Sequence, residues 1–181
     1  MKYFIILILA VPLFTFCGQS NEKSANSQNK LQETDQNINA TYYLIRHAEK
    51  DRSNPKNHDP NLNIDGMLRA KRWAEYFEPI KIDEIYITKY IRTKQTVSLI
   101  AQQKAISPKR YNPKTIYSNE FLNQTNGKTV LIAGHSNTTP QLVNKLISEE
   151  KYSDMDDSDN ATLFKVTING NNKSVETIIV E

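Results

Sequence analysis

The sequence is poor in the residues that build disulfides and zinc sites. Among its 181 residues there is one cysteine, Cys17, and there are only three histidines. A lone cysteine excludes an internal disulfide, and no cluster of cysteines and histidines with zinc-ligand spacing is present. The formal net charge is also small, at +3, and the basic residues are scattered along the chain. This distribution argues against nucleic acid as a partner.

The chain also lacks an apolar run long enough to span a bilayer, which takes about 20 residues. Its longest apolar run, residues 3–16, follows Lys2 and is interrupted by Pro12. That shape is typical of a secretion signal, which we predict over residues 1–17. The alternative is a buried N-terminal helix, but the polar residues that follow would give such a helix nothing to pack against.

Cys17 stands where this apolar run ends and is followed by Gly18. The placement resembles the lipobox of bacterial lipoproteins, in which the cysteine is acylated, although Phe16 replaces the small residue usual there. The resemblance implies an exported protein of the bacterial cell envelope, attached to a membrane through a lipid on Cys17. Residues 18–39 are rich in Asn, Gln, Ser and charge, and we predict a disordered polar tether there.

Residues 40–181 alternate between strand-like and helix-like patterns, which predicts one domain. We expect strands at 40–45, 84–88, 128–134, 161–168 and 174–180, an edge strand within 106–113, and helices within 61–80, 91–105 and 139–147, with a short helix after Pro113. The expected fold class is α/β: a three-layer sandwich with a mostly parallel central sheet and antiparallel last strands.

Two helices have apolar positions that we assign to the core. In the helix within 61–80 these are Met67, Ala70, Trp73, Ala74 and Phe77, and Pro79 ends the pattern. In the helix at 91–105 they are Ile91, Val97, Leu99 and Ile100. These positions predict which side of each helix lies against the sheet.

Three predicted strand ends carry residues suited to binding an anion. Arg46 and His47 follow the first strand, Arg92 lies just inside the helix after the second, and His135 follows the strand at 128–134. Ligands of such sheets gather beyond the carboxyl ends of the strands. An arginine offers two phosphate oxygens a planar fork of donors, and Gly134 allows close backbone approach. These features together suit a phosphoryl group.

The order and spacing of these residues resemble the histidine phosphatase superfamily, also called phosphoglycerate mutase-like. Four elements carry the resemblance: Arg46-His47-Ala48-Glu49, the stretch from Thr88 to Thr96 with Arg92 and Gln95, Gly134-His135-Ser136-Asn137, and "NLNIDG" at 61–66, in which Asn63 replaces the usual threonine. The likeness runs from about residue 41 to residue 168 and implies the fold of that superfamily.

The resemblance also implies a chemistry. His47 would attack a phosphomonoester and become a transient phosphohistidine, while Arg46, Arg92 and His135, with Asn137, would bind the phosphoryl group. No metal or cofactor would be needed, and the substrate would be a phosphorylated small molecule or a phosphoprotein. The alternative is a binding module that holds a phosphorylated ligand without turnover.

The proton donor to the leaving group is open between Glu49, which is close to His47 in sequence, and Glu120, in the region where larger relatives supply a glutamate. Only 42 residues separate Arg92 from His135. Larger relatives insert a lid there, so the resemblance is to the short, lidless branch, and we expect an open site.

Two other stretches are assigned to the surface. His58 lies in a polar loop, with contact to substrate as the alternative. Residues 153–160, "SDMDDSDN", carry several carboxylates that could suggest calcium. The stretch lacks the glycine and the terminal glutamate of the common calcium loop, so we expect a solvated acidic turn.

Overall fold

The computed structural model describes residues 37–181. The predicted signal at 1–17, with Cys17, and the tether up to residue 36 lie outside the described residues. The strands are β1 (Asn39–Arg46), β2 (Glu84–Ile87), β3 (Lys109–Arg110), β4 (Thr129–Gly134), β5 (Thr162–Asn169) and β6 (Asn172–Ile179), and the helices are α1 (Ile64–Phe77), α2 (Ile91–Lys104), α3 (Asn119–Gln124) and α4 (Thr138–Ile147).

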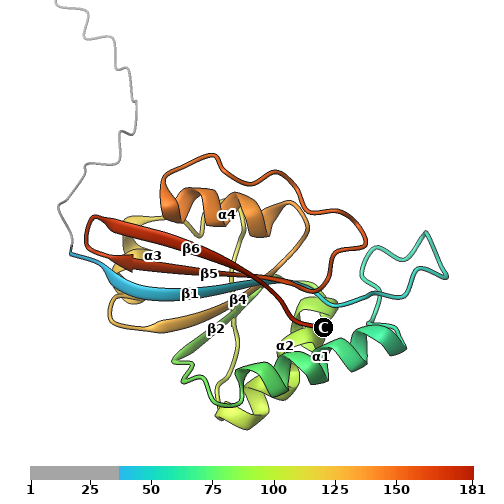
Figure 1. The fold of residues 1–181 in the computed structure, drawn as a ribbon. Helices are drawn as coiled ribbons and strands as arrows, with labels where there is room; N and C mark the ends of the chain where they lie inside the picture. Colours follow the sequence, from blue (N-terminus) through green and yellow to red (C-terminus); the bar gives the residue numbers. More distant parts are fainter. Residues whose placement is uncertain (1–36) are drawn as a thin grey trace, which may run out of the picture. The chain divides into compact units, whose positions relative to one another are not determined.

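The strands form one sheet in the order β3-β2-β4-β1-β5-β6 (Figure 1). The pairs β2–β3, β2–β4 and β1–β4 are parallel, whereas β5 pairs antiparallel with β1 and with β6. The predicted α/β fold with a mostly parallel sheet and antiparallel last strands is therefore confirmed. The edge strand expected within 106–113 is β3, and the short helix after Pro113 is α3.

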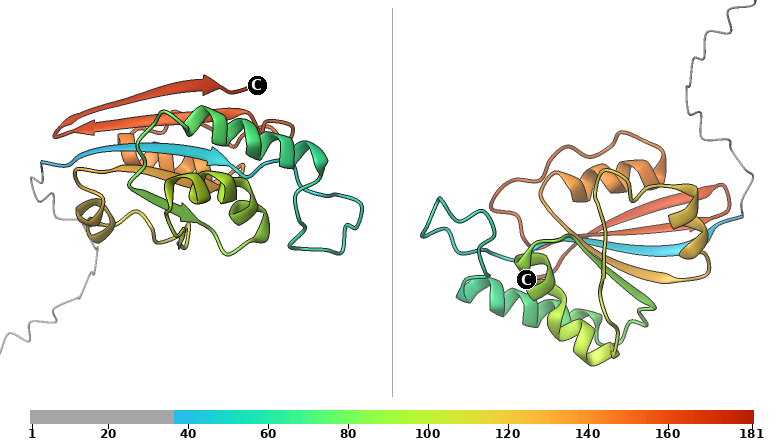
Figure 2. Two further views of the ribbon diagram at one scale, coloured as in Figure 1. Left: turned by 90° about the horizontal axis from the view of Figure 1, so that it is seen from below. Right: turned by 180° about the vertical axis from the view of Figure 1, so that it is seen from behind.

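Helices cover both faces of the sheet (Figures 1 and 2). On one face, Tyr42 and Leu44 of β1 pack with residues of α3 and α4, such as Phe121 and Leu142. On the other face, Tyr43 and Ile45 pack with residues of α1 and α2, which include Trp73, Phe77, Val97 and Ile100. Successive side chains of a strand point to opposite faces, which explains why the run at 40–45 is continuously apolar.

The core faces of α1 and α2 differ in part from the prediction. Ala70, Trp73, Ala74 and Phe77 are buried as expected, but Met67 is 58 % exposed. Ile91 and Leu99 are also largely exposed, and Thr93 and Thr96 are buried with Val97 and Ile100. The core assignments of these three residues were wrong, and for Ile91 and Leu99 the reason is that α2 turns its threonine-bearing side toward the sheet. Among residues 37–181, no helix combines the length and the apolar character required to cross a bilayer.

The start of α1 is fixed against the chain segment that follows β1. Asn63 is the N-cap, and its side chain accepts a hydrogen bond from the Gly66 backbone N–H, the role that a threonine can also fill. A Cβ on Gly66 would overlap the carbonyl oxygen of Glu49, so this position requires glycine. Lys50 and Leu62 form an isolated antiparallel bridge beside it. The residues after His47 are thus held by the first turn of α1.

Candidate active site

The two predicted site histidines meet where β1 and β4 end. These strands are parallel neighbours, with Arg46 in register with Gly134. The chain after β1 enters α1 on one face of the sheet, and the chain after β4 enters α4 on the other (Figure 1). Such a point, where the direction of the connections reverses, opens a crevice at the carboxyl edge of a sheet. The rings of His47 and His135 lie there with their centroids 5.4 Å apart.

His47 is 4 % exposed, and its ring has a defined tautomer. Nδ1 lies 2.8 Å from the carbonyl oxygen of Ala48, which can only accept, so Nδ1 carries the proton and Nε2 keeps its lone pair. Burial is the main cause that lowers the pKa of His47 to about 3, opposed by the hydrogen bond to Ala48 and reinforced by Arg92, His135 and Arg46. The imidazole is therefore neutral near pH 7.

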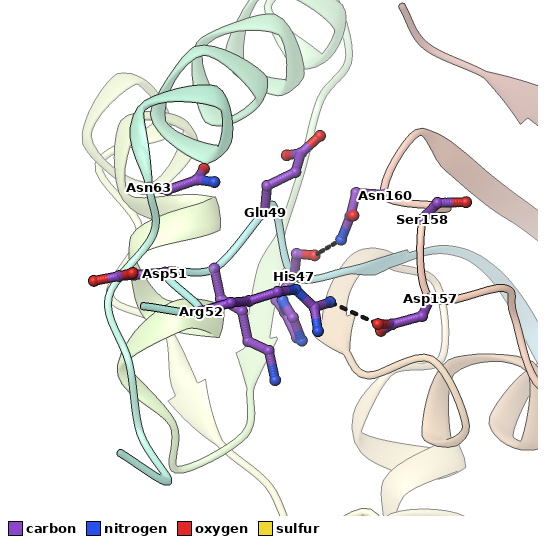
Figure 3. Close-up of a pocket in the computed structure, with 9 residues that line it drawn as sticks. His47, Glu49, Asp51, Arg52, Asn63, Asp157, Ser158 and Asn160 are labelled. Atoms are coloured by element: carbon purple, nitrogen blue, oxygen red, sulfur yellow. Dashed lines mark hydrogen bonds and ion pairs between the residues drawn. The ribbon is translucent and has the colours of Figure 1, made fainter. Parts of the chain in front are cut away.

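The backbone around His47 is held on several sides. The His47 N–H donates to the carbonyl oxygen of Gly134 at 3.0 Å, and the Asn160 side-chain amide donates to the carbonyl oxygen of His47 at 2.7 Å (Figure 3). The Ala48 N–H donates to Oγ1 of Thr96 in α2. These bonds come from β4, α2 and the loop before β5, so the position of the imidazole is set before any ligand binds.

His135 is fixed by residues from the end of β2. Its Nε2 lies 3.0 Å from Oγ1 of Thr88, and the ring of Tyr90 meets it edge-on with centroids 5.1 Å apart. Burial, followed by the charges of Arg92, Arg46 and Lys50, lowers the pKa of His135 to about 4. His135 is therefore also neutral near pH 7, and it can donate to a phosphoryl oxygen through its single ring N–H.

Arg92 is buried at the start of α2 with donors to spare. It is 9 % exposed, its guanidinium stacks over the ring of Tyr90 at 4.1 Å, and its nearest carboxylate, that of Asp59, is 3.6 Å away. Its Nε and one terminal nitrogen are buried without a hydrogen-bond partner within the part of the chain that the structure describes. Buried donors are normally paired, so these two nitrogens indicate a place for an anion.

Arg46, unlike Arg92, has both terminal guanidinium nitrogens bonded to the protein. One terminal nitrogen donates to the carbonyl oxygens of Asp156, Asp157 and Asp159 at 2.8 to 3.0 Å, and the other donates to the Asp157 carboxylate at 2.8 Å. Only Nε is buried without a partner. Arg46 thus lies at the site but presents to a ligand one N–H rather than a fork.

The two predicted proton donors are not placed alike. Glu49 lines the pocket beside His47, but its carboxylate is paired with Nε of Arg69 at 2.9 Å and points away from His47 toward α1 (Figure 3). Glu120 lies on α3, whose Phe121 packs on Tyr42 near the opposite end of β1, and its exposed carboxylate accepts from Gln124. The structure therefore excludes Glu120 from this site, because α3 lies at the amino end of the sheet.

Asn137 is the N-cap of α4, with its side chain accepting from the Thr138 N–H. His58 is exposed in the loop after Lys50, as expected. The acidic stretch at 153–160 is more than a solvated turn, because its carbonyl groups and Asp157 hold Arg46. Within residues 37–181, no group of three or more His, Cys, Asp and Glu side chains is placed to hold a metal ion.

A pocket of about 270 Å³ adjoins His47, between the loop after β1 and the loop before β5 (Figure 3). Its lining includes Lys50, Arg52, Asp157 and Asn160. Sequence analysis gave no role in this site to Lys50, Arg52 or Tyr90. Thr88 and Thr96 bounded the motif around Arg92 but were given no role of their own, and Asp157 and Asn160 lay in the stretch that we assigned to a solvated turn. No motif linked that stretch to His47, since it lies more than 100 residues from β1.

Comparisons with known proteins agree with this geometry. The chain matches the family model of the histidine phosphatase superfamily (branch 1) over residues 42–113. No curated protein matches its sequence. Among solved structures it is similar to the protein histidine phosphatase SixA complexed with tungstate, with 13 % identity and a TM-score of 0.61 over 77 % of this chain and 96 % of that one.

Two further structures are similar at comparable levels. Phosphoglycerate mutase from Bacillus anthracis gives 13 % identity and a TM-score of 0.61, over 80 % of this chain and 94 % of that one. A mutant phosphoserine phosphatase from Entamoeba histolytica, in complex with phosphoserine, gives 12 % identity and a TM-score of 0.60, over 78 % of this chain and 97 % of that one. With its phosphoglycerate mutase-like fold and the family-model match over residues 42–113, this chain is similar to the histidine phosphatase superfamily.

Proposed function

We propose that this protein is a phosphomonoester hydrolase that works through a phosphohistidine on His47. The observation that carries the proposal is the pairing of a buried, neutral imidazole, whose Nε2 is unprotonated, with two unpartnered guanidinium nitrogens of Arg92. A nucleophile needs that lone pair, and a phosphoryl group needs those donors.

The reaction has two displacements. First, Nε2 of His47 bonds to phosphorus while the bond to the ester oxygen breaks, and the leaving group departs as an anion that takes a proton from water. Then water adds to phosphorus, the N–P bond breaks, and inorganic phosphate leaves with His47 neutral again. Arg92, His135 and Nε of Arg46 offset the charge on the phosphoryl oxygens in both steps. Because guanidinium groups supply this stabilisation, we propose that turnover needs no metal.

Whether the leaving group must be protonated determines which phosphate esters react fastest. Glu49 is engaged with Arg69, Glu120 is remote, and His135 is neutral near pH 7. Neither of the two glutamates predicted as proton donors is therefore placed as a free acid beside His47. We expect phosphate esters whose leaving groups need no protonation, such as aryl phosphates, to react faster than alkyl phosphates.

The test is hydrolysis of an aryl phosphate by the domain beginning near Asn39, with and without a chelator, for the parent and for His47→Asn. The matched control is His58→Asn, which changes an exposed histidine. We expect chelator-resistant turnover in the parent and the control, a loss of about 10³-fold or more in His47→Asn, and an acid-labile phosphoenzyme on rapid quenching. A folded parent that binds phosphate without turning over any ester would instead indicate the binding module.

We propose further that the domain is exported and attached to the envelope through acylated Cys17. The placement of this cysteine after an apolar run supports the proposal. Full-length protein should fractionate with membranes, and Cys17→Ser should release it with its activity unchanged. Equal membrane association of both forms would contradict a lipid anchor at this position.

A further inference from the structure

Lys50 is a cation beside His47 that forms no ion pair with any residue in the described range 37–181. It lines the same pocket as His47 and is partly buried. Among residues 37–181, no carboxylate lies within 4.0 Å of its ammonium group, and its Nζ donates no hydrogen bond. Its backbone is fixed by the bridge to Leu62, so the side chain starts from a defined point.

The charge of Lys50 reaches the catalytic groups. Burial is the main cause that lowers the pKa of His135, and Lys50 adds to this effect together with Arg92 and Arg46. Burial also lowers the pKa of Lys50, reinforced by Arg52, Arg92 and Arg46 and opposed by Asp157. Lys50 therefore lines the pocket at His47 and acts electrostatically on His135.

The carboxylates around this site are engaged with other groups, and among residues 37–181 none of them pairs with Lys50. Asp157 is shared between Arg46 and Arg52, and Asp59 is only loosely paired with Arg92. Glu49 is occupied by Arg69, and the Asp51 carboxylate accepts from the Ser53 N–H and points away from His47 (Figure 3). The Lys50 ammonium, which none of these carboxylates contacts, is therefore available to pair with a phosphoryl group, which is close to dianionic at neutral pH.

Arg46 cannot take up that group with its usual fork, because the loop at 156–159 occupies both of its terminal nitrogens. We propose that the Lys50 ammonium takes this place and binds the phosphoryl group together with Arg92. Arg46 then has two parts: its terminal nitrogens fasten the loop before β5, and its Nε completes the site. This assignment rests on the proposed function, since it names a further residue that binds the transferred group.

The test compares Lys50→Met and Lys50→Arg with the parent and with Lys56→Met, an exposed lysine of the same loop that forms no ion pair among the described residues. Two quantities are measured: the dissociation constant of inorganic phosphate by calorimetry, and kcat and KM for an aryl phosphate. We expect Lys50→Met to weaken phosphate binding and to lower kcat/KM, each by about 10- to 100-fold. Lys50→Arg should restore most of both, and Lys56→Met should match the parent.

Phosphate binding by folded Lys50→Met that equals the parent's would overturn the assignment while leaving the proposed function intact, provided that the parent turns over substrate. A parent without turnover, in which Lys50→Met still loses phosphate affinity, would overturn the proposed function and keep Lys50 as a ligand of the anion. A parent that does not bind phosphate would overturn both. Circular dichroism of each variant separates loss of binding from loss of folding.

Discussion

The two ends of strand β1 differ in how their polar atoms are satisfied. At the amino end, the Tyr42 hydroxyl is bonded to Oγ1 of Thr125 at 2.6 Å, and the ring packs on Phe121. At the carboxyl end, Arg46 and Arg92 keep buried nitrogens without a partner. The first end therefore adds stability to the sheet, whereas the second leaves favourable interactions unformed until an anion arrives. The two ends should respond to mutation in opposite ways.

The largest effect is expected at the carboxyl end. Arg92→Met should lower kcat/KM for an aryl phosphate by about 10²- to 10³-fold, because it removes donors to the transferred group. It should not lower the free energy of unfolding, since it also removes a poorly compensated buried charge. Arg110→Met, on the exposed edge strand β3, is the control and should change neither quantity. A marked loss of stability in Arg92→Met would break the comparison.

The amino end should give the reverse result. Phe121→Ala empties a position packed against Tyr42 and Tyr86 and should cost about 3 kcal/mol in the free energy of unfolding. Denaturant unfolding gives this number, and kcat of the folded protein should stay within about twofold because α3 lies far from His47. A fall in kcat of the folded variant well beyond twofold would show that the two ends of β1 are coupled, and it would contradict their separate roles.

The two buried histidines at the carboxyl end should make the protein less stable in acid. His47 and His135 have pKa values of about 3 and about 4 in the folded protein, against 6.5 for an ordinary histidine. The unfolded chain therefore binds more protons below pH 6.5, and the free energy of unfolding should fall as pH decreases.

Each histidine should contribute up to about 1.4 kcal/mol per pH unit between pH 6 and 5, a window in which most carboxylates stay ionised in both states. Denaturant unfolding at a series of pH values measures the slope. His47→Asn should make it shallower, and His58→Asn should leave it unchanged. An equal slope in His47→Asn would show that His47 is not neutral through burial.

The smallest effect is expected from removing one oxygen atom at the amino end of β1. Tyr42→Phe removes the hydroxyl that pairs with Thr125 and should cost about 1 kcal/mol of stability. Turnover should be unchanged. Since Thr125 Oγ1 also donates to the Phe121 carbonyl, the loss is limited to one hydrogen bond. A cost near zero would mean that water replaces the hydroxyl at this end.

Sequence patterns were sufficient for the sheet and for the strand ends. The continuous run at 40–45 indicated a strand buried on both faces, and the alternation of strands and helices indicated a mostly parallel sheet, whereas the pairing of β1 with β4 is known only from the structure. That pairing alone brings His47 and His135 together. The exposure of Met67 was not predictable, because an amphipathic pattern leaves open which of two adjacent stripes meets the sheet.

The features of the site that were not predicted depend on contacts between segments distant in the sequence. Arg46 was expected to bind phosphate through both terminal nitrogens of its guanidinium group. One of these nitrogens instead donates to backbone carbonyl groups that lie more than 100 residues away in the sequence. Backbone oxygens carry no residue-specific signal, so no motif marks them. The same holds for Glu49, whose engagement with Arg69 depends on the packing of α1. Lys50 follows the Arg46–Glu49 motif directly in the sequence. Its proposed role as a phosphate ligand became apparent only in the structure, where its ammonium group forms no ion pair with any described residue.

Glycine at 66 has a consequence for how this protein can diversify. Since its Cα lies against the Glu49 carbonyl, and the Lys50–Leu62 bridge closes the base of the loop between them, the nucleophile's segment is clamped independently of the residues beyond the bridge. Residues 51–58 are all exposed. Insertions there should be tolerated, so this loop is the place to graft segments that recognise a chosen phosphorylated molecule while the chemistry stays in place.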